Sequence, residues 1–205
     1  MGKQWMNFVW FSLVLVGIIL ASVIFGGYSS LHRSEGRIDI TKEFFLGSCQ
    51  SRLDLLPQLL DFLKESEAKE MLTKLKQTGK EANTVLHHAV SQKSPLDRVL
   101  TLKLEKSQSA LTKELIKTFL KLEQQSNSKK STEAFQTIKK QFFSAQDKMF
   151  VERVRYNTEV RYFNRRTKIF PGFLIAKLFG FNKSEYFELS KDLFLGADKT
   201  FEDQG

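Results

Sequence analysis

The stretch RYNTEVRYFNRRTKIFP, Arg155–Pro171, contains two aromatic-Asn pairs seven residues apart and ends in Phe-Pro. At about 100° of rotation per helical residue, five of its side chains fall within an arc of about 80°. They form the stripe that a bundle helix buries: Tyr156, Val160, Phe163, Thr167 and Phe170. We therefore expect a long helix from about residue 132 to 169 that packs in a helical bundle and is ended by Pro171.

Asn157 and Asn164 lie together on one shoulder of this stripe, between core and solvent. A carboxamide there can hydrogen-bond to a neighbouring helix, and a semi-buried Asn fixes helix register at some cost in stability. We interpret the pair as a structural latch in preference to a ligand site. Four basic residues fall outside the stripe and are expected in solvent: Arg161, Arg165, Arg166 and Lys168.

The composition indicates an all-α protein. The 205 residues contain three prolines and eleven glycines, and no Asn-Gly or Asp-Gly turn separates alternating apolar runs. With 41% hydrophobic residues, the chain can form a membrane segment and one modest globular domain.

The N-terminal segment predicts a transmembrane helix. No formal charge occurs from Gln4 to Leu31, and about 20 helical residues at about 1.5 Å each span a bilayer core. Aromatic residues lie near both ends, as in an aromatic belt. The alternative is a cleaved signal peptide, but the small-residue cleavage site is poor, so we expect an uncleaved anchor. Its representative residues are Phe8, Trp10, Val16, Ile19 and Phe25.

The orientation follows from the positively charged residues that flank the span. Lys3 stands alone before it, whereas Arg33, Arg37 and Lys42 follow it. The positive-inside rule therefore places the large C-terminal domain in the cytoplasm.

The rest of the chain predicts three long helices and a short fourth. The segment RLDLLPQLLDFL, Arg52–Leu63, places leucines on one helical face, and Pro57 either kinks a long helix or lies in the first turn of a new one capped near Asp54. This pattern reaches Val90. The second helix is expected from a Ser94 cap and Pro95 to about residue 125, with its buried side formed by Leu104, Leu111, Leu115, Phe119 and Leu122.

Three regions are expected along the chain. Residues 1–31 form the short N-terminus and anchor, residues 32–189 form the antiparallel bundle, and residues 190–205 form a polar, frayed tail. Within the second region, residues 172–180 (GFLIAKLFG) predict a short apolar helical turn that glycine stops.

Two segments resemble a known family. YNTEVRYFNRRTKIFPGFLIAKLFGFNKSEYFEL, Tyr156–Leu189, resembles the C-terminal signature of the LemA family, and RLDLLPQLL, Arg52–Leu60, is similar to the family's first conserved helix. Phe163 stands where tyrosine is usual, which indicates a divergent member. The residues that carry the resemblance are Arg52, Asp54, Pro57, Tyr156, Asn157, Val160, Phe163, Asn164, Phe170, Pro171, Ala176, Phe179, Tyr186 and Phe187.

The resemblance implies one transmembrane helix followed by an antiparallel helical bundle on the cytoplasmic side. It implies no established enzymatic activity and no cofactor.

The residues themselves also favour a protein without catalytic activity. The sequence has no GxxxxGK[ST] loop and no GxGxxG motif, and no nucleophile, base and orienting group can be named together. His87 and His88 are adjacent, so they point about 100° apart on a helix and cannot form an i, i+4 metal-binding pair. The single cysteine, Cys49, excludes an intramolecular disulfide. We expect no metal and no cofactor.

Two functional hypotheses remain. The first is a membrane-anchored interaction or scaffold protein that presents the apolar turn to an unidentified protein partner through Phe173, Leu174, Leu178, Phe179 and Phe181. The alternative is a basic bundle that binds anionic lipid headgroups or nucleic acid through Arg153, Arg155, Arg161, Arg165, Arg166 and Lys168. The net charge of +9 is spread among acidic residues, and no RNA-binding motif occurs, so nucleic acid is the less favoured ligand.

Overall fold

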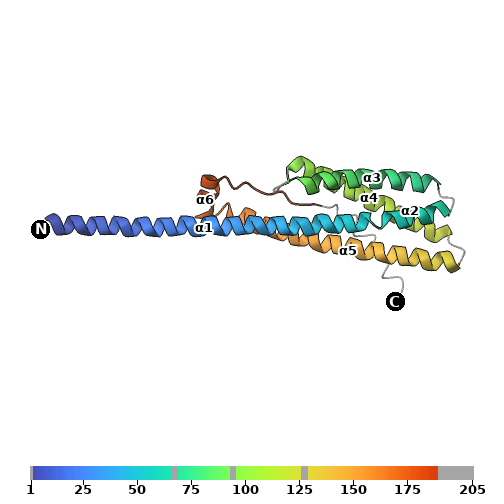
Figure 1. The fold of residues 1–205 in the computed structure, drawn as a ribbon, viewed down its shortest axis with the longest axis horizontal. Helices are drawn as coiled ribbons and strands as arrows, with labels where there is room; N and C mark the ends of the chain where they lie inside the picture. Colours follow the sequence, from blue (N-terminus) through green and yellow to red (C-terminus); the bar gives the residue numbers. More distant parts are fainter. Residues whose placement is uncertain (1, 66–68, 93–95, 126–128, 189–205) are drawn as a thin grey trace. The chain divides into compact units, whose positions relative to one another are not determined.

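The computed structural model describes residues 2–65, 69–92, 96–125 and 129–188 (Figure 1). These residues form helices, turns and one extended C-terminal segment, and no strand occurs among them. The helices are α1 (Gly2–Leu53), α2 (Leu56–Glu65), α3 (Lys69–Ser91), α4 (Arg98–Gln125), α5 (Lys129–Arg166) and α6 (Gly172–Phe179). The predicted all-α class is therefore confirmed. The polar tail predicted for residues 190–205 lies outside the described part of the chain.

The chain divides into two compact units. The N-terminal unit comprises the described residues up to Asp39 together with Thr158–Ser184. The bundle unit comprises Ile40–Asn157 and the described residues from Glu185 onward. Both α1 and α5 contribute to each unit, so each unit is described by itself below.

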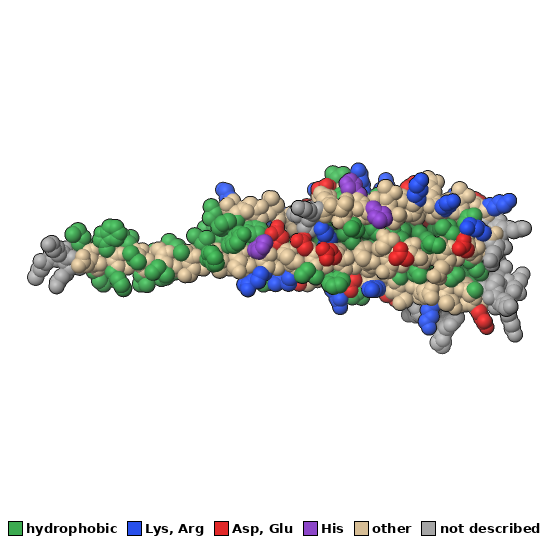
Figure 2. All heavy atoms as spheres, viewed as in Figure 1, with side chains coloured by type: hydrophobic (Ala, Val, Ile, Leu, Met, Phe, Trp, Pro, Cys, Tyr) green, Lys and Arg blue, Asp and Glu red, His purple; other side chains and the backbone are tan. Residues whose placement is uncertain are grey.

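The apolar N-terminal segment and the first bundle segment are one continuous helix. α1 runs for 52 residues without interruption, and the predicted boundary at residue 31 falls inside it. In the part of the chain that is described, α1 is the one helix long and apolar enough to cross a membrane. Its hydrophobic side chains at the N-terminal end are exposed all round the helix, with Phe8 69% and Phe25 78% exposed (Figure 2).

Pro57 begins a new helix and does not kink an existing one. α1 ends at Leu53, and Pro57 is the second residue of α2. A backbone N–H in the first turn of a helix has no acceptor within that helix, so proline costs no hydrogen bond at this position. The buried side of α2 includes Leu59 and Leu63. α2 approaches α3 closely at Gly79, because a Cβ on this glycine would lie 2.6 Å from Leu56 Cδ1.

Asp97 is the N-cap of α4. Its carboxylate Oδ1 accepts a hydrogen bond of 2.7 Å from the backbone N–H of Leu100, three residues on. The sequence predicts a Ser94 cap and a helix from Pro95, but α4 begins only at Arg98; Ser94 and Pro95 lie outside the described residues. The predicted buried face of α4 is confirmed, because all five of its residues are at most 4% exposed.

We expect the cap to make stability depend on acidity. The hydrogen bond from Leu100 N–H, and then the one from the Gln92 side chain, lower the pKa of Asp97 below its usual 3.8. The folded state therefore favours the carboxylate, so this stabilisation is complete above about pH 4 and is lost as the pH falls toward the lower folded pKa. Asp97→Ala should lower the melting temperature at neutral pH, and Asp97→Asn, which keeps the acceptor, should not. Equal melting temperatures of Asp97→Ala and wild type, measured by circular dichroism, would contradict the assignment of this cap.

The stripe predicted on α5 is buried over most of its length. Tyr156, Val160 and Phe163 are at most 2% exposed. The prediction for Phe170 is wrong, because this side chain is 76% exposed. The physical reason is that α5 ends at Arg166 and the chain then turns, so the helical period no longer applies.

Gly172 allows the chain to reverse after α5. A Cβ on Gly172 would collide with the backbone oxygen of Arg166, so a larger residue would force the two segments apart. Pro171 precedes α6 as its N-cap residue, and Gly180 ends α6 in the left-handed conformation with a φ of 76°. The predicted short helix stopped by glycine is confirmed.

Candidate functional site

α6 packs against α1 directly after the apolar segment. Ile175 is buried against Gly27, where a Cβ would overlap the Ile175 side chain. The Tyr28 ring lies 4.7 Å from the ring of Phe179 and 5.7 Å from that of Phe181. These contacts fix α6 at the residues of α1 that follow Phe25, where the mostly apolar run that begins at Phe8 ends.

The outer face of α6 carries the apolar side chains that the sequence singled out. We call four exposed residues the α6 patch; their exposed fractions lie between 47% and 68%: Phe173, Leu174, Leu178 and Phe179. The fifth predicted residue, Phe181, is half-buried, and its ring contacts that of Phe163 edge-on at 6.3 Å. The inner face of α6 is formed by Ile175 and Ala176. Phe179 also contacts Tyr28 through part of its ring, so the patch consists of the apolar surface that stays uncovered after the helix has packed.

A pocket of about 370 Å³ lies in the same unit. Gly27 and Leu31 of α1 line one part of it, and Tyr162, Arg165 and Arg166 at the end of α5 line another. The turn after α5 completes the lining with Ile169, Phe170, Pro171 and Gly172. We call this site the α1–α5 pocket. It combines two guanidinium groups with an apolar floor.

In the described part of the chain, no carboxylate pairs with the two arginines that line the α1–α5 pocket. Arg37 stands over one side of the Tyr162 ring at 5.4 Å, and its Nε donates a 2.9 Å hydrogen bond to Glu159. Arg166 also lies over this ring, at 5.3 Å. Within the described residues, neither Arg165 nor Arg166 forms an ion pair. Two positive charges therefore face the pocket without compensation.

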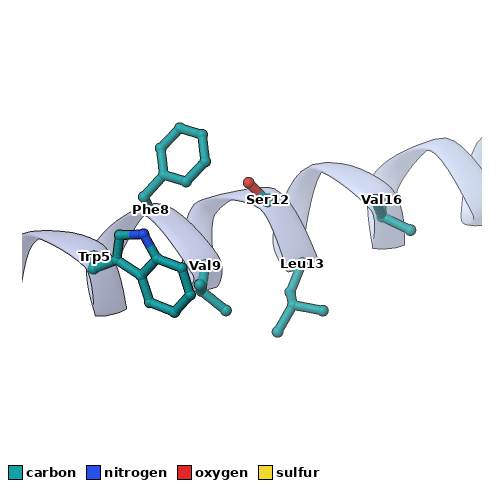
Figure 3. A pocket seen from close by; sticks show the side chains of 6 residues that line it. All are labelled: Trp5, Phe8, Val9, Ser12, Leu13 and Val16. Carbon is teal, nitrogen blue, oxygen red and sulfur yellow. The ribbon is translucent and has the colours of Figure 1, made fainter.

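A second hollow lies on the apolar segment itself, as Figure 3 shows. It is lined by Trp5, Phe8, Val9, Ser12, Leu13 and Val16, all from α1. Because one helix supplies every side chain, this is an open groove on the helix surface with no charged group. It can make apolar contacts, but it contains no ionisable side chain.

Each latch asparagine holds one backbone residue through two hydrogen bonds. In the N-terminal unit, Asn164 Nδ2 donates to the carbonyl of Ser184 at 2.8 Å, and its Oδ1 accepts from the Ser184 N–H at 3.0 Å. In the bundle unit, Asn157 pairs in the same way with Phe187, at 2.8 and 2.9 Å. Both asparagines therefore pair with the extended segment after α6. The sequence predicted a neighbouring helix as their partner, and this prediction is wrong.

The spacing of the asparagines matches the geometry of the two backbones. Seven helical residues rise about 10.5 Å, and three extended residues cover about 10 Å. Residues seven apart on α5 can therefore hold residues three apart in the extended segment. The buried Phe187 ring contacts Phe45 at 4.6 Å and Tyr156 at 5.0 Å, so the latch also holds an aromatic core contact in the bundle unit.

Arg52 is fully buried in the bundle unit, and no carboxylate among the described residues pairs with it. Its guanidinium donates at 2.6 Å to both Thr112 Oγ1 and Gln146 Oε1, and it also donates to the carbonyl and side-chain oxygens of Gln108. The network therefore joins α1, α4 and α5. Arg52 Nε and Gln108 Nε2 have no hydrogen-bond partner within the described residues.

Burial changes the acid-base chemistry of this network. It lowers the pKa of Arg52 to about 10, so the guanidinium is still charged at neutral pH. Cys49 is also fully buried, and burial raises the pKa of its thiol to about 12, although the nearby Arg52 charge opposes this. A thiol with so high a pKa is a poor nucleophile, so Cys49 is a core residue here.

The remaining predicted residues do not gather into one site. Arg153 lies over the Phe150 ring at 5.1 Å and Arg155 pairs with Glu152 at 2.9 Å, both in the bundle unit. Asp54 accepts a hydrogen bond from Gln50, and Tyr186 is half-buried. Among the described residues, no three His, Cys, Asp or Glu side chains come together in a way that could hold a metal ion.

The partners of Arg52 were not predicted from the sequence; they are Gln108, Thr112 and Gln146. One signal was present: Gln108 stands between Leu104 and Leu111, on the leucine-lined face of α4. A polar residue in an apolar stripe needs a buried partner, and a buried arginine supplies one.

Together these features define a class: an all-α protein whose bundle is continuous with a helix able to cross a membrane. The LemA family model matches residues 46–193, which is most of the chain. The protein therefore belongs to the LemA family. Searches of curated proteins and of solved structures find no match to it.

Proposed function

We propose that this protein is a single-pass, membrane-anchored scaffold whose α6 patch binds a protein partner beside the membrane, and that it is not an enzyme. The observation that carries the proposal is the packing of α6 on Gly27 and Tyr28. It leaves apolar side chains exposed directly after a segment able to span a bilayer. Exposed contiguous apolar surface of this kind usually marks an interaction site.

The same packing supports an uncleaved anchor. The small-residue sites considered for cleavage lie between Ala21 and Tyr28, inside the uninterrupted helix α1. Cleavage after Tyr28 would remove the contacts that hold Ile175 and Phe179, and cleavage after Val23 would leave Gly27 and Tyr28 at a new N-terminus. After alkaline carbonate extraction, we expect full-length chain in the membrane pellet; a shortened, extractable chain would contradict the anchor.

A cytoplasmic bundle is supported by the basic residues near the end of the span. Arg33 and Arg37 follow it in sequence, and the N-terminal unit also contains Arg165, Arg166 and Lys168. Cations concentrated on one side of a span favour the cytoplasmic side. Protease added to spheroplasts, whose plasma membrane is intact but exposed, should therefore leave the bundle undigested.

The partner surface is tested by photo-crosslinking of the full chain in intact membranes. A crosslinker at residue 173 should capture a defined partner, and the Leu174→Asp/Leu178→Asp variant should lose at least about tenfold of this crosslink, because a buried charge disrupts an apolar interface. Val99→Asp/Leu102→Asp is the matched control, since both residues are similarly exposed on α4 in the bundle unit. An unchanged crosslink pattern in the α6 variant would show that the patch is not the partner surface.

A further inference from the structure

We propose that the α1–α5 pocket binds the phosphate group of an anionic phospholipid. This inference rests on the membrane anchor of the proposed function but not on the protein partner. The pocket is lined by Arg165 and Arg166, which have no ion-pair partner within the described residues, and by apolar side chains of the turn after α5.

The depth of the pocket along α1 agrees with a lipid headgroup. Gly27 and Leu31 follow Phe25 by two and six residues, which corresponds to about 3 and 9 Å along a helix. The headgroup region extends about 5–8 Å beyond the hydrocarbon core on each side of a bilayer. With Phe25 at the edge of the core, the pocket opens where phosphates lie.

The chemistry of the lining matches both parts of a phospholipid. A guanidinium donates two parallel hydrogen bonds to phosphate oxygens and holds them more specifically than a lysine would. The Tyr162 ring lies beneath the Arg166 guanidinium and restricts it. Ile169 and Phe170 are exposed, at 52% and 76%, and would contact the upper acyl chain and glycerol. The exposed position of Phe170, which the helical wheel did not predict, thereby acquires a role.

Charge alone does not explain the site. Arg37 also contacts Tyr162, but Glu159 neutralises it, so the positive charge of the pocket lining itself comes from Arg165 and Arg166. Free inorganic phosphate presents the same oxygens. It does not use the apolar floor, so we assign the lipid.

The test uses the full chain in mild detergent and native mass spectrometry, which counts bound lipids. Wild type should bind phosphatidylglycerol about tenfold more tightly than phosphatidylcholine, because both lipids present the same phosphate oxygens but choline adds a positive charge that the two guanidinium groups repel. Arg165→Gln/Arg166→Gln should abolish this preference. The matched control is Arg161→Gln/Lys177→Gln, which removes two exposed charges from the same unit outside the pocket lining and should keep the preference.

Several results would overturn the proposal. An unchanged preference in Arg165→Gln/Arg166→Gln would exclude the pocket, and an equal loss in the control would indicate diffuse surface charge. Binding of inorganic phosphate as tight as that of phosphatidylglycerol would make the site a phosphate site and not a lipid site. Should the double variant fail to fold, Arg165→Gln alone tests the same point, because this side chain is exposed and forms no ion pair in the described part of the chain.

The two proposals fail in different ways. If carbonate releases the chain from membranes, the proposed membrane anchor is wrong, whatever lipid preference is measured in detergent. If the chain stays in the membrane and the arginine variant still prefers phosphatidylglycerol, only the pocket assignment is wrong.

Discussion

Arg52→Ala is expected to lower the free energy of unfolding by about 3–5 kcal/mol, a large share of the total for a domain of this size. The substitution leaves Thr112, Gln108 and Gln146 with buried oxygens that have lost their charged donor. Each such hydrogen bond is worth about 1.5–3 kcal/mol. It also leaves a cavity in place of one of the largest fully buried side chains of the protein.

One effect opposes this loss. The lowered pKa of Arg52 shows that burial penalises the charged guanidinium, and removal of the charge relieves that penalty. Alanine nevertheless destabilises, because relief of desolvation does not restore a donor to the three buried side-chain oxygens or fill the cavity. Arg52→Met fills most of the space. The difference in the free energy of unfolding between the Met and Ala variants therefore measures the cost of the cavity, and the difference between wild type and the Met variant measures the cost of the polar groups that have lost their donor.

The control is a variant that removes the whole polar network. Arg52→Met/Gln108→Leu/Thr112→Val/Gln146→Leu should be about as stable as wild type or more stable, because apolar replacement of buried polar clusters is often neutral or better. Urea denaturation of the full chain in mild detergent, followed by circular dichroism, measures all three variants. A loss below about 1 kcal/mol for Arg52→Ala would mean that water reaches the network and satisfies it.

Local periodicity predicted most of the buried faces, but the helix predicted from Arg52 to about Val90 is the end of α1 followed by α2 and α3. Leu111 and Leu115 on α4, and Tyr156 and Phe163 on α5, are buried as their spacing predicts. Periodicity could not predict where α5 stops, since the sequence continues the helical pattern to Phe170. The end is set by a chain reversal that requires Gly172 against Arg166, a contact between residues that no helical wheel compares.

The candidate site was less accessible to sequence reasoning. Arginines are mostly exposed in proteins, so the burial of Arg52 had no local signal apart from Gln108 in an apolar stripe. The α1–α5 pocket requires Gly27 and Arg165 in one unit, although they are far apart in the sequence. The asparagine latch was recognised, but its partners are backbone groups of Ser184 and Phe187, and a backbone partner leaves no side-chain pattern to read.

Asn164→Ala is expected to release the extended segment after α6 from α5 and to cost about 2–5 kcal/mol. Asn164 and Ser184 are 4% and 3% exposed, so the substitution strips a buried N–H and a buried carbonyl of their partner. Each unsatisfied group costs about 1–3 kcal/mol. The Ser184 amide should lose more than tenfold of its protection in hydrogen exchange, which is the measurement that isolates this bond.

Asn182→Ala is the matched control, because Asn182 lies in the same segment but is exposed, and its side chain donates a 3.2 Å hydrogen bond to the nearby Gly180 carbonyl. Its cost should stay within about 0.5 kcal/mol. Equal protection of Ser184 in both variants would contradict the latch.

Asn164→Asp separates the two hydrogen bonds of the latch. The carboxylate still accepts from the Ser184 N–H but cannot donate to the Ser184 carbonyl, and it places an unpaired charge in a buried position. Burial raises the pKa of such a carboxyl, so protonation at mildly acidic pH restores both a donor and a neutral group. Because the folded state then binds the proton more tightly than the unfolded state, this variant should gain stability as the pH falls toward the raised pKa, relative to Asn164→Ala. A constant difference between the two variants across that range would show that Asn164 holds the segment by shape alone and not by its two hydrogen bonds.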